Sequence, residues 1–312
     1  MISQVNIFFQ CLWIIIEILL TSCYNDTLNP EYFRKRGFFL NHTDVLHYFQ
    51  NQSHTDDMVI RQLMYAYRQD CRYDRKIPNP AYDRRPFIVF EGNHRTSRKI
   101  VARRFAKVFG GSYLETPPKC LIALRGLFPV NSMERRGYFA LSSYALALTV
   151  KRVWNHFPIV ANGYWFEHHS YSLYKEFGQD LPPEGSFIYD WPKDLLEPDF
   201  TFYINFPDNL HYQGTERPRS SWKHVTNEVF NRLNLKNSYI VNTEDGFNSV
   251  LDEIEVVLKA KLSARFPGIS YKFQTVAAFD RFSRHSRPLK AYENFYSPPQ
   301  YNNSRQYLTK VL

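Results

Sequence analysis

"RPFIVFEGNHRTSRKIVARRFAKVFGG" occupies residues 85–111, and this stretch decides the fold class. The apolar run at 87–90 predicts a buried strand that meets a Gly at its end. A basic helix is expected over residues 99–109, ended by Gly110 and Gly111. Phosphate-binding loops have the same order of strand, Gly-led loop and helix, so the stretch predicts that layout.

Eight consecutive residues form the predicted loop, and all are candidate nucleotide or phosphate ligands: Gly92, Asn93, His94, Arg95, Thr96, Ser97, Arg98 and Lys99. A working loop reads G-x-x-x-x-G-K-[ST], whereas here Ser97 replaces the second Gly and Arg98 replaces the Lys. Lys99 occupies the position of the hydroxyl residue that ligates Mg²⁺. Because a Lys side chain has no lone pair for the metal and carries a like charge, Mg²⁺ is not expected to bind.

Positive charge nevertheless gathers at the start of this helix. Helix N-termini favour anions, and cationic side chains are added by Arg95, Arg98, Lys99 and, when protonated, His94. Two interpretations stay open. Either the loop binds phosphate or a nucleotide such as ATP weakly and without Mg²⁺, or it is a basic helix start that binds no ligand.

The rest of the chain alternates strands with helices from residue 86 to about residue 262. Further strands are expected at 157–164, 199–206 and 238–242, and further helices at 133–154, 225–235 and 246–262. Such alternation predicts an α/β fold with a parallel sheet flanked by helices.

Irregular extensions flank this domain, so the chain divides into four parts: an apolar leader or anchor at 1–23, a polar helical extension and linker at 24–85, the α/β domain at 86–262 and a basic aromatic tail at 263–312. Capping residues and helical spacing predict helices within 41–49 and 55–69. The charged, Pro-bearing stretch 74–86 predicts a domain boundary.

The apolar run at 5–20 is short for a membrane span and contains Glu17. Its length suits the hydrophobic region of a signal peptide, although the first basic residue is Arg34. A mitochondrial presequence would be Arg-rich, which this stretch is not. Asn-x-Ser/Thr sequons begin at Asn25, Asn41, Asn51 and Asn302. They favour the secretory pathway, with membrane association through 5–20 as an alternative.

The composition is that of a globular chain with a basic surface. Hydrophobic residues make up 44% of the 312 residues, and the formal net charge is +9. This charge favours phosphates, other polyanions or anionic membranes as partners, or it simply gives a solvated basic face. Because no recognisable nucleic-acid-binding motif accompanies the charge, no nucleic acid partner is expected.

Four cysteines are present, and none forms a C-x-x-C pair, so no zinc site is expected. Cys11 and Cys23 lie in or next to the apolar run. Cys71 and Cys120 remain as one candidate disulfide, but the sequence favours two buried free thiols.

Five stretches together resemble the thymidylate kinase family of P-loop nucleoside monophosphate kinases, and most of all its mitochondrial UMP/CMP kinase branch. They are "FIVFEG" at 87–92, "LETPPKC" at 114–120, "ERRGYFALSSY" at 134–144, "PIVANGYW" at 158–165 and "YDWPKDLLEPDFTFYINFP" at 189–207. The resemblance covers about residues 86–262. It implies transfer of a phosphoryl group from MgATP to a pyrimidine nucleoside monophosphate, and a homodimer built on the helix at 133–154. By the same analogy, the mitochondrion is an alternative location to the secretory pathway or the membrane.

The family's site residues carry over only in part. Gly92 matches the first loop Gly, while His94 stands where the family often has an acidic residue. The family's D-R-Y falls on Asn162, Gly163 and Tyr164. The Asp that organises Mg²⁺ and the Arg that holds the acceptor phosphate are therefore both missing, and Glu115 replaces a basic residue before "PP".

The resemblance also implies which residues act on the substrates. The acceptor pocket is expected to contain Arg135, Arg136, Asn162, Tyr164 and Trp165. The lid, shortened to "HYQGTERPRSSWK" at 211–223, offers Arg217 and Arg219. With Arg98 and Lys99, these two form the candidate catalytic set.

Three functions fit this pattern. The first, which we favour, is a catalytically impaired relative that keeps weak nucleotide or phosphate binding. The second is a secreted or membrane-associated interaction protein whose cleft is closed. The third is an active kinase for dTMP, UMP or CMP with unusual ligands. Loss of several contributions to charge neutralisation argues against the third, because each contributes orders of magnitude in rate.

Overall fold

The computed structural model describes Trp13 and residues 29–51, 57–72, 84–207, 221–233 and 235–266. All of them fall within one compact unit, Met1–Phe273. Most of the leader, the lid residues Arg217 and Arg219, and the tail from residue 267 lie outside the described residues. Within the described part, no helix is long and apolar enough to span a membrane.

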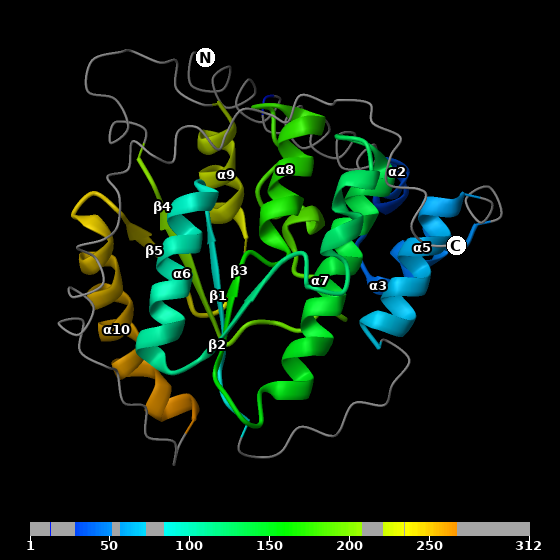
Figure 1. Cartoon of the computed structure of the whole chain (residues 1–312). Helices are drawn as coiled ribbons and strands as arrows, with labels where there is room; N and C mark the ends of the chain where they lie inside the picture. Colours follow the sequence, from blue (N-terminus) through cyan, green and yellow to red (C-terminus); the bar gives the residue numbers. More distant parts are fainter. Residues whose placement is uncertain are drawn as a thin grey trace, which may run out of the picture. The chain divides into compact units, whose positions relative to one another are not determined.

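Five parallel strands form one sheet in the order β2-β3-β1-β4-β5. Their bounds are Phe87–Gly92 for β1, Ser112–Glu115 for β2, Ile159–Asn162 for β3, Phe200–Asn205 for β4 and Ser238–Asn242 for β5. Central β1 lies between β3 and β4 (Figure 1). The expected α/β fold with a parallel sheet is confirmed. The sequence missed β2, because this four-residue edge strand is only half-buried and lacks a continuous apolar run.

Helices cover both faces of the sheet (Figure 1). Their bounds are Pro30–Lys35 for α2, His42–Gln50 for α3, Met58–Tyr65 for α5, Arg95–Phe109 for α6, Met133–Val153 for α7, Phe166–Phe177 for α8, Ser221–Arg232 for α9 and Gly246–Arg265 for α10; short turns are the π-helix η1 at Ala66–Asp70 and the 3₁₀ helices η2 at Ile122–Leu127 and η3 at Phe187–Tyr189. The expected helix at 133–154 is confirmed as α7, and those at 225–235 and 246–262 as α9 and α10. The sequence missed α8.

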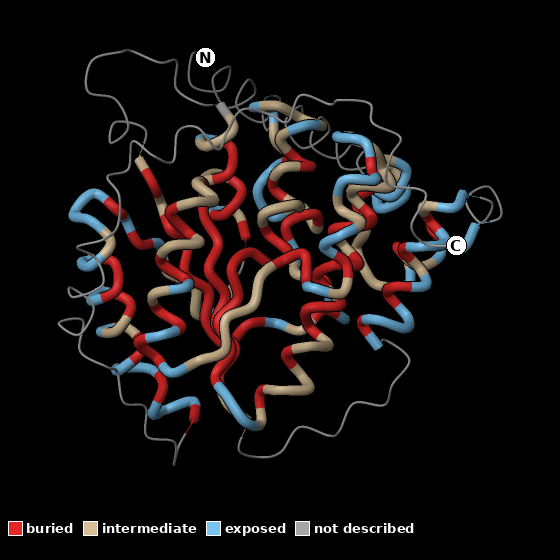
Figure 2. The backbone as a smooth tube through the Cα atoms, in the orientation of Figure 1, coloured by how far each residue is buried: buried red, intermediate tan, exposed pale blue. Residues whose placement is uncertain are grey.

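Alternate residues of β1 supply two separate apolar cores. Phe87 and Val89 pack in the core that contains α7, α8 and α9. Ile88 and Phe90 pack in the core that contains α6 and α10. Because both faces are covered, every residue of β1 is buried (Figure 2), which explains its unbroken apolar run.

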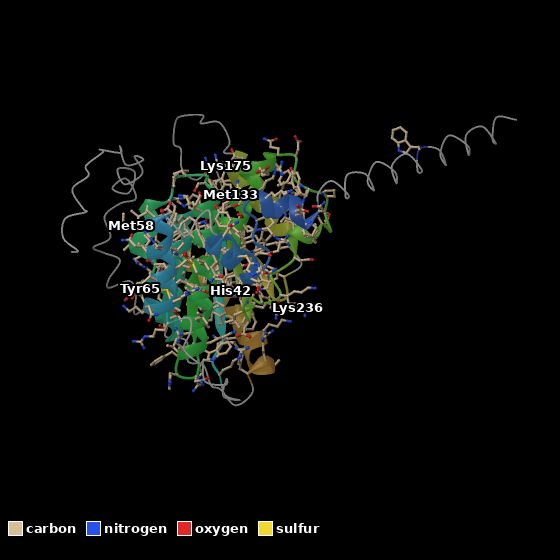
Figure 3. The ribbon with its side chains drawn as sticks, turned by 90° about the vertical axis from the view of Figure 1, so that its right-hand side faces the viewer. His42, Met58, Tyr65, Met133, Lys175 and Lys236 are labelled. Atoms are coloured by element: carbon tan, nitrogen blue, oxygen red, sulfur yellow. A yellow bond between two sulfur atoms is a disulfide. The ribbon has the colours of Figure 1, made fainter. Side chains whose placement is uncertain are left out.

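The N-terminal extension packs against the α/β domain. Phe33 belongs to the same core as β1, and Phe49 contacts α7 where Gly137 leaves room for its ring. A Cβ at position 137 would lie 2.7 Å from the Phe49 ring. The outer face of α5 remains open, with Met58 59% and Tyr65 67% exposed (Figure 3). Of the expected boundary, residues 73–83 lie outside the described residues.

A disulfide joins Cys71, which follows η1, to Cys120, which precedes η2. The expectation of two free thiols was therefore wrong. Sequence spacing did not reveal the pair, because the cysteines are 49 residues apart and meet only when the extension folds onto the domain, with their Cα atoms 5.3 Å apart.

Candidate functional site

The candidate site lies at the carboxyl ends of β1, β3 and β4. From β1 the chain first runs to β2 at one edge of the sheet, and after β3 it crosses to β4 on the other side of β1. In open α/β sheets, the crevice outside the strand ends at such a reversal is where ligands bind.

The turn between β1 and α6 is much shorter than expected. Strand β1 ends at Gly92 and α6 begins at Arg95, so only Asn93 and His94 separate them. The expected eight-residue loop and the helix start at Lys99 were wrong, because His94 caps the helix with its side chain and lets it begin four residues earlier. A phosphate-binding loop of the G-x-x-x-x-G-K-[ST] type places four residues between its two glycines, whereas only two residues lie between strand and helix here.

Gly92 is required at this turn by the close approach of β4. A Cβ there would lie 2.3 Å from the carbonyl oxygen of Ile204, a separation that no side chain tolerates. The Gly that the sequence assigned to a phosphate-binding loop therefore has a structural role in strand packing.

Asn93 and His94 are both held by neighbouring elements. The Asn93 amide nitrogen donates to the side-chain oxygens of Asn205 (2.7 Å) and Asn227 (3.1 Å), and its oxygen accepts from the backbone N–H of Phe206 (2.8 Å). His94 Nδ1 lies 2.7 Å from the hydroxyl of Ser97, and the His94 ring packs 4.8 Å from the ring of Phe206. Contacts with β4 and α9 thus fix the turn and cover it with an aromatic ring.

Arg98 points below the turn, into the protein. Its side chain is 1% exposed. Its Nε donates to Asn162 Oδ1 (2.8 Å), and its Nη2 donates to Glu167 Oε2 (2.7 Å). Glu91 Oε2 lies 3.7 Å from its Nη1. The guanidinium therefore joins β1, β3 and α8, and its hydrogen bonds are made to protein groups.

The two carboxyl groups around Arg98 differ in protonation. Burial raises the pKa of Glu91 to about 8 despite the nearby guanidinium. Glu91 Oε1 accepts from the N–H of Tyr164 (2.8 Å), but its Oε2 has no hydrogen bond within the described structure. Burial would also raise the pKa of Glu167, but the charge and hydrogen bond of Arg98, together with the other positive charges nearby, outweigh burial and lower that pKa to about 2.

Lys99 is engaged on the other side of α6. Its Nζ lies 3.0 Å from Glu115 Oε2, and the same oxygen accepts from the hydroxyl of Tyr113 (3.0 Å). Both carboxylate and ammonium are about one-third exposed. The residue in the place of the Mg²⁺-binding hydroxyl thus forms an ion pair with the edge strand β2.

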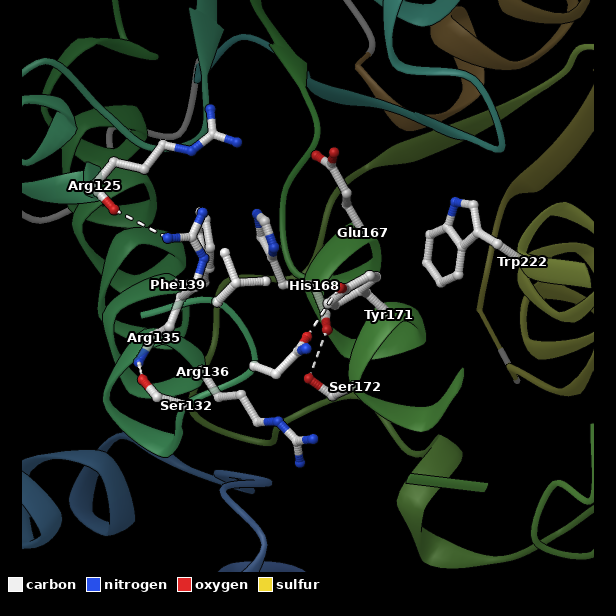
Figure 4. Close-up of a pocket in the computed structure, with 12 residues that line it drawn as sticks. Arg125, Ser132, Arg135, Arg136, Phe139, Glu167, His168, Tyr171, Ser172 and Trp222 are labelled. Carbon is white, nitrogen blue, oxygen red and sulfur yellow. Dashed lines mark hydrogen bonds between the residues drawn. The ribbon is translucent and has the colours of Figure 1, made fainter. Parts of the chain in front are cut away.

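A cavity of about 250 Å³ opens beside this turn, between α7 and α8, with Trp222 of α9 on its rim (Figure 4). Its lining combines cationic, aromatic and polar side chains: Arg125, Val130, Asn131, Ser132, Arg135, Arg136, Phe139, Glu167, His168, Tyr171, Ser172 and Trp222. We call this cavity the α7–α8 pocket.

The structure brings only part of the expected acceptor set to this pocket. Arg135 and Arg136 line it. Asn162 instead binds Arg98. Tyr164 is fully buried and donates its hydroxyl to the carbonyl of Leu196 (3.1 Å). Trp165 stacks on His169 and lines an adjoining cavity of about 40 Å³, which shares four lining residues with the α7–α8 pocket: Arg136, Phe139, His168 and Ser172. Asn162, Tyr164 and Trp165 are not among the residues that line the α7–α8 pocket, and their role in binding an acceptor stays a prediction.

The two predicted arginines also have protein partners. Arg135 Nη1 donates to the carbonyls of Phe128 (2.8 Å) and Arg125 (3.2 Å). Arg136 donates to the carbonyl of Arg36 and lies 3.8 Å from Glu176. Arg136 therefore links the pocket wall to the end of α2 in the extension.

Sequence reasoning missed several of the lining residues. Burial lowers the pKa of Arg125, and the nearby positive charges of Arg95 and Arg135 lower it further. His168 stacks on Phe139 with ring centroids 3.3 Å apart, and burial lowers its pKa to about 3, so it is neutral. The positive charge around Arg125 favours an anion in the pocket, where Glu167 is the acidic lining residue that opposes it. His168 lies on α8, the helix that the sequence did not predict. A helix predicted from the sequence at Phe166–Phe177 is the signal that would have revealed this residue.

The described residues include no group of three or more His, Cys, Asp or Glu side chains that could hold a metal ion. The pocket presents arginines, aromatic rings, polar side chains and the carboxylate of Glu167.

The fold and this site define an α/β protein consistent with a P-loop kinase-like domain. No protein-family model matches the sequence. A similar curated protein is human mitochondrial UMP-CMP kinase 2, which is 27% identical over 161 residues, or 49% of this chain. The chain covers 36% of the length of that relative. The similarity supports a relationship with nucleoside monophosphate kinases.

Proposed function

We propose that this chain is a nucleoside monophosphate kinase-like protein that has lost phosphoryl transfer and binds a phosphate-bearing nucleotide in the α7–α8 pocket. The observation that carries this proposal is the two-residue turn between β1 and α6. That turn leaves no loop long enough to surround the phosphates of a donor nucleotide.

Phosphoryl transfer depends on positioning and on neutralising charge at the transferred group. Here Arg98 is committed to Asn162 and Glu167, and Lys99 to Glu115. Neither cation is placed to contact a β- or γ-phosphate without breaking these interactions. We therefore expect ATP to bind weakly, and Mg²⁺ not to change that binding.

The pocket retains the features of a monophosphate site. Arg125 lines the pocket and is subject to the positive charges of Arg95 and Arg135. Phe139, Tyr171 and Trp222 supply aromatic surface. A phosphate group would relieve the repulsion among these cations, and a base would stack on the rings. The printed name of the human relative, UMP-CMP kinase 2, makes UMP and CMP the first ligands to test.

Calorimetry of the full chain tests this function. UMP, CMP and dTMP would be titrated separately, and ATP would be titrated with Mg²⁺ and with EDTA. We expect a monophosphate to bind, ATP binding to be weak and unaffected by EDTA, and no ADP to form from ATP plus any monophosphate. Arg125→Ala should weaken monophosphate binding at least tenfold, or about 1.4 kcal/mol.

Arg103→Ala is the matched control, because it removes an exposed arginine from α6 that is not among the pocket-lining residues. It should leave affinity unchanged. ADP formation that depends on Mg²⁺ would contradict the proposal and favour an active kinase. No binding of any nucleotide would contradict it in favour of an interaction protein with a closed cleft.

A further inference from the structure

Two of the four sequon asparagines, Asn41 and Asn51, lie among the described residues, at opposite ends of α3. They have the same local sequence signal for N-linked glycosylation, Asn-x-Ser/Thr. Their structural surroundings differ in a way that the sequence does not show.

Asn51 lies at the C-terminal end of α3 and is exposed to solvent. Its backbone leaves the helix in an extended conformation, with φ −62° and ψ 140°. A bulky, hydrated glycan attached there would extend into solvent without displacing a buried group. This position therefore suits a folded glycoprotein.

Asn41 is the N-cap of the same helix, and both polar atoms of its side chain are engaged. Its Oδ1 accepts from the N–H of Asp44 (2.8 Å), and its Nδ2 donates to the Asp44 carboxylate (3.0 Å). Asp44 also lies 3.2 Å from Arg34 of α2. A glycan on Nδ2 would crowd this half-buried cluster, so a chain modified at Asn41 would be less stable when folded.

The disulfide between Cys71 and Cys120 is an independent sign of the same environment. Both cysteines lie in the folded unit, and their bond joins the extension to the segment that carries Arg125. Disulfides form and persist in secretory and extracellular compartments, whereas the cytosol keeps thiols reduced. The compartments that add N-glycans are thus also those that favour this bond.

We propose that the chain folds in the secretory pathway and carries an N-linked glycan on Asn51, while Asn41 remains unmodified. The donor is a lipid-linked oligosaccharide diphosphate. A bond forms between Asn51 Nδ2 and the anomeric carbon of the first sugar as Nδ2 loses a proton. The bond from that carbon to the diphosphate oxygen breaks, and the lipid diphosphate leaves with the electron pair. This location differs from the compartment in the relative's printed name.

The test is expression of the full chain in cultured animal cells, with free thiols alkylated at lysis. Peptide:N-glycosidase F in ¹⁸O-water marks each formerly glycosylated asparagine by mass. We expect the mark on Asn51 in most folded molecules and on Asn41 in very few. Cys71 and Cys120 should be recovered unalkylated and joined.

Two variants check the assignment. Asn51→Gln and Ser53→Ala each remove the Asn51 sequon, and Ser53→Ala does so while keeping the asparagine, so both should abolish the mark at position 51. Asn41→Gln is the matched control and should leave that mark unchanged. An unmarked Asn51 in folded protein, a marked Asn41, or alkylated Cys71 and Cys120 would each overturn the proposal. None of these outcomes depends on nucleotide binding.

Discussion

Arg98 lies fully buried under the β1–α6 turn and links three elements through one guanidinium group. Its position in the sequence predicted a phosphate ligand, because the kinase Lys would stand there. The structure instead surrounds it with Glu91, Asn162 and Glu167. A buried charge of this kind needs partners, and here the protein itself supplies them.

Replacing Arg98 should destabilise the fold. Arg98→Ala leaves Glu167 as an uncompensated charge, and breaking a buried pair in this way typically costs about 3–5 kcal/mol. Urea unfolding followed by circular dichroism measures the change. Arg103→Ala is the matched control and should stay within about 0.5 kcal/mol of the parent. If both variants lose the same free energy of unfolding, the buried network around Arg98 does not stabilise the fold.

Stability should fall as pH rises through neutrality because of Glu91. Its pKa is raised to about 8 in the folded chain. Between its unfolded value and pH 8 the folded state therefore keeps a proton that the unfolded state releases. From pH 6.5 to pH 8 we expect a loss of about 2 kcal/mol. Glu91→Gln should flatten this slope in urea unfolding, and an unchanged slope would refute the assignment.

Two buried histidines act in the opposite direction at lower pH. Burial lowers the pKa of His168 to about 3 and that of His169 to about 4. As pH falls below about 6.5, these histidines become protonated in the unfolded state but stay neutral in the folded state. The free energy of unfolding therefore falls. Maximum stability is therefore expected near pH 6.5.

At the scale of the element, the early start of α6 decides the chemistry of the turn. His94 caps the helix at Arg95, and only two residues separate the helix from Gly92, where β4 approaches closely. The backbone groups that would form a phosphate cradle are thus part of a helix. A change of motif residues alone does not lengthen the turn.

Restoring the motif should not restore catalysis. We expect a triple variant, Ser97→Gly with Arg98→Lys and Lys99→Thr, to show no Mg²⁺-dependent ADP formation above the parent chain, because the short turn remains. It should also lose stability, because the ion pairs of Arg98 with Glu167 and of Lys99 with Glu115 are broken. A coupled assay with ATP and UMP measures the first effect, and appearance of activity would contradict this account of the turn.

The disulfide between the extension and η2 should contribute measurable stability. Replacing Cys71 and Cys120 together by Ser opens a link between residues 49 apart. A loop of this size typically contributes about 2–4 kcal/mol. Urea unfolding of the double variant, compared with the parent before and after reduction, checks this. The reduced parent should have the same free energy of unfolding as the double variant. If the oxidised parent is no more stable than the double variant, the prediction is contradicted.

At the scale of the whole molecule, the extension and the α/β domain share their cores. Phe33 packs with strands and helices of the sheet domain, and Phe49 packs on α7 at Gly137. Arg136 joins the pocket wall to the carbonyl of Arg36. A part of the chain that lacked the extension would therefore expose apolar surface of α7.

A core substitution in the extension should weaken the entire unit. Phe49→Ala creates a cavity against α7, and losses of this type are about 3–5 kcal/mol. Four of the five tryptophans lie in the sheet domain, Trp154, Trp165, Trp191 and Trp222, and the fifth, Trp13, is already 68% exposed. Changes in tryptophan fluorescence therefore report mainly on the sheet domain, while circular dichroism reports on all helices. Both signals should shift together to lower urea. Separate transitions would show that the extension unfolds independently.

Much of the fold was predictable because its signals are local. A continuous apolar run marked β1, an aromatic-rich run marked β4, and caps or helical spacing marked α3, α5 and α7. Helix α8 was missed, and with it the pocket residue His168. In the site, the loop and Arg135 were predicted as ligands from the motif alone, but motif position does not specify where a side chain points.

The amino-acid sequence by itself determined the alternation of strands and helices, the parallel sheet and the resemblance to nucleoside monophosphate kinases, because these depend on hydrophobic periodicity and short motifs. The tertiary structure alone decided that Arg98 and Lys99 bind carboxylates, that Cys71 and Cys120 meet, and that a pocket opens between α7 and α8. These features depend on contacts between residues far apart in the chain, and such contacts are specified only when the elements pack together.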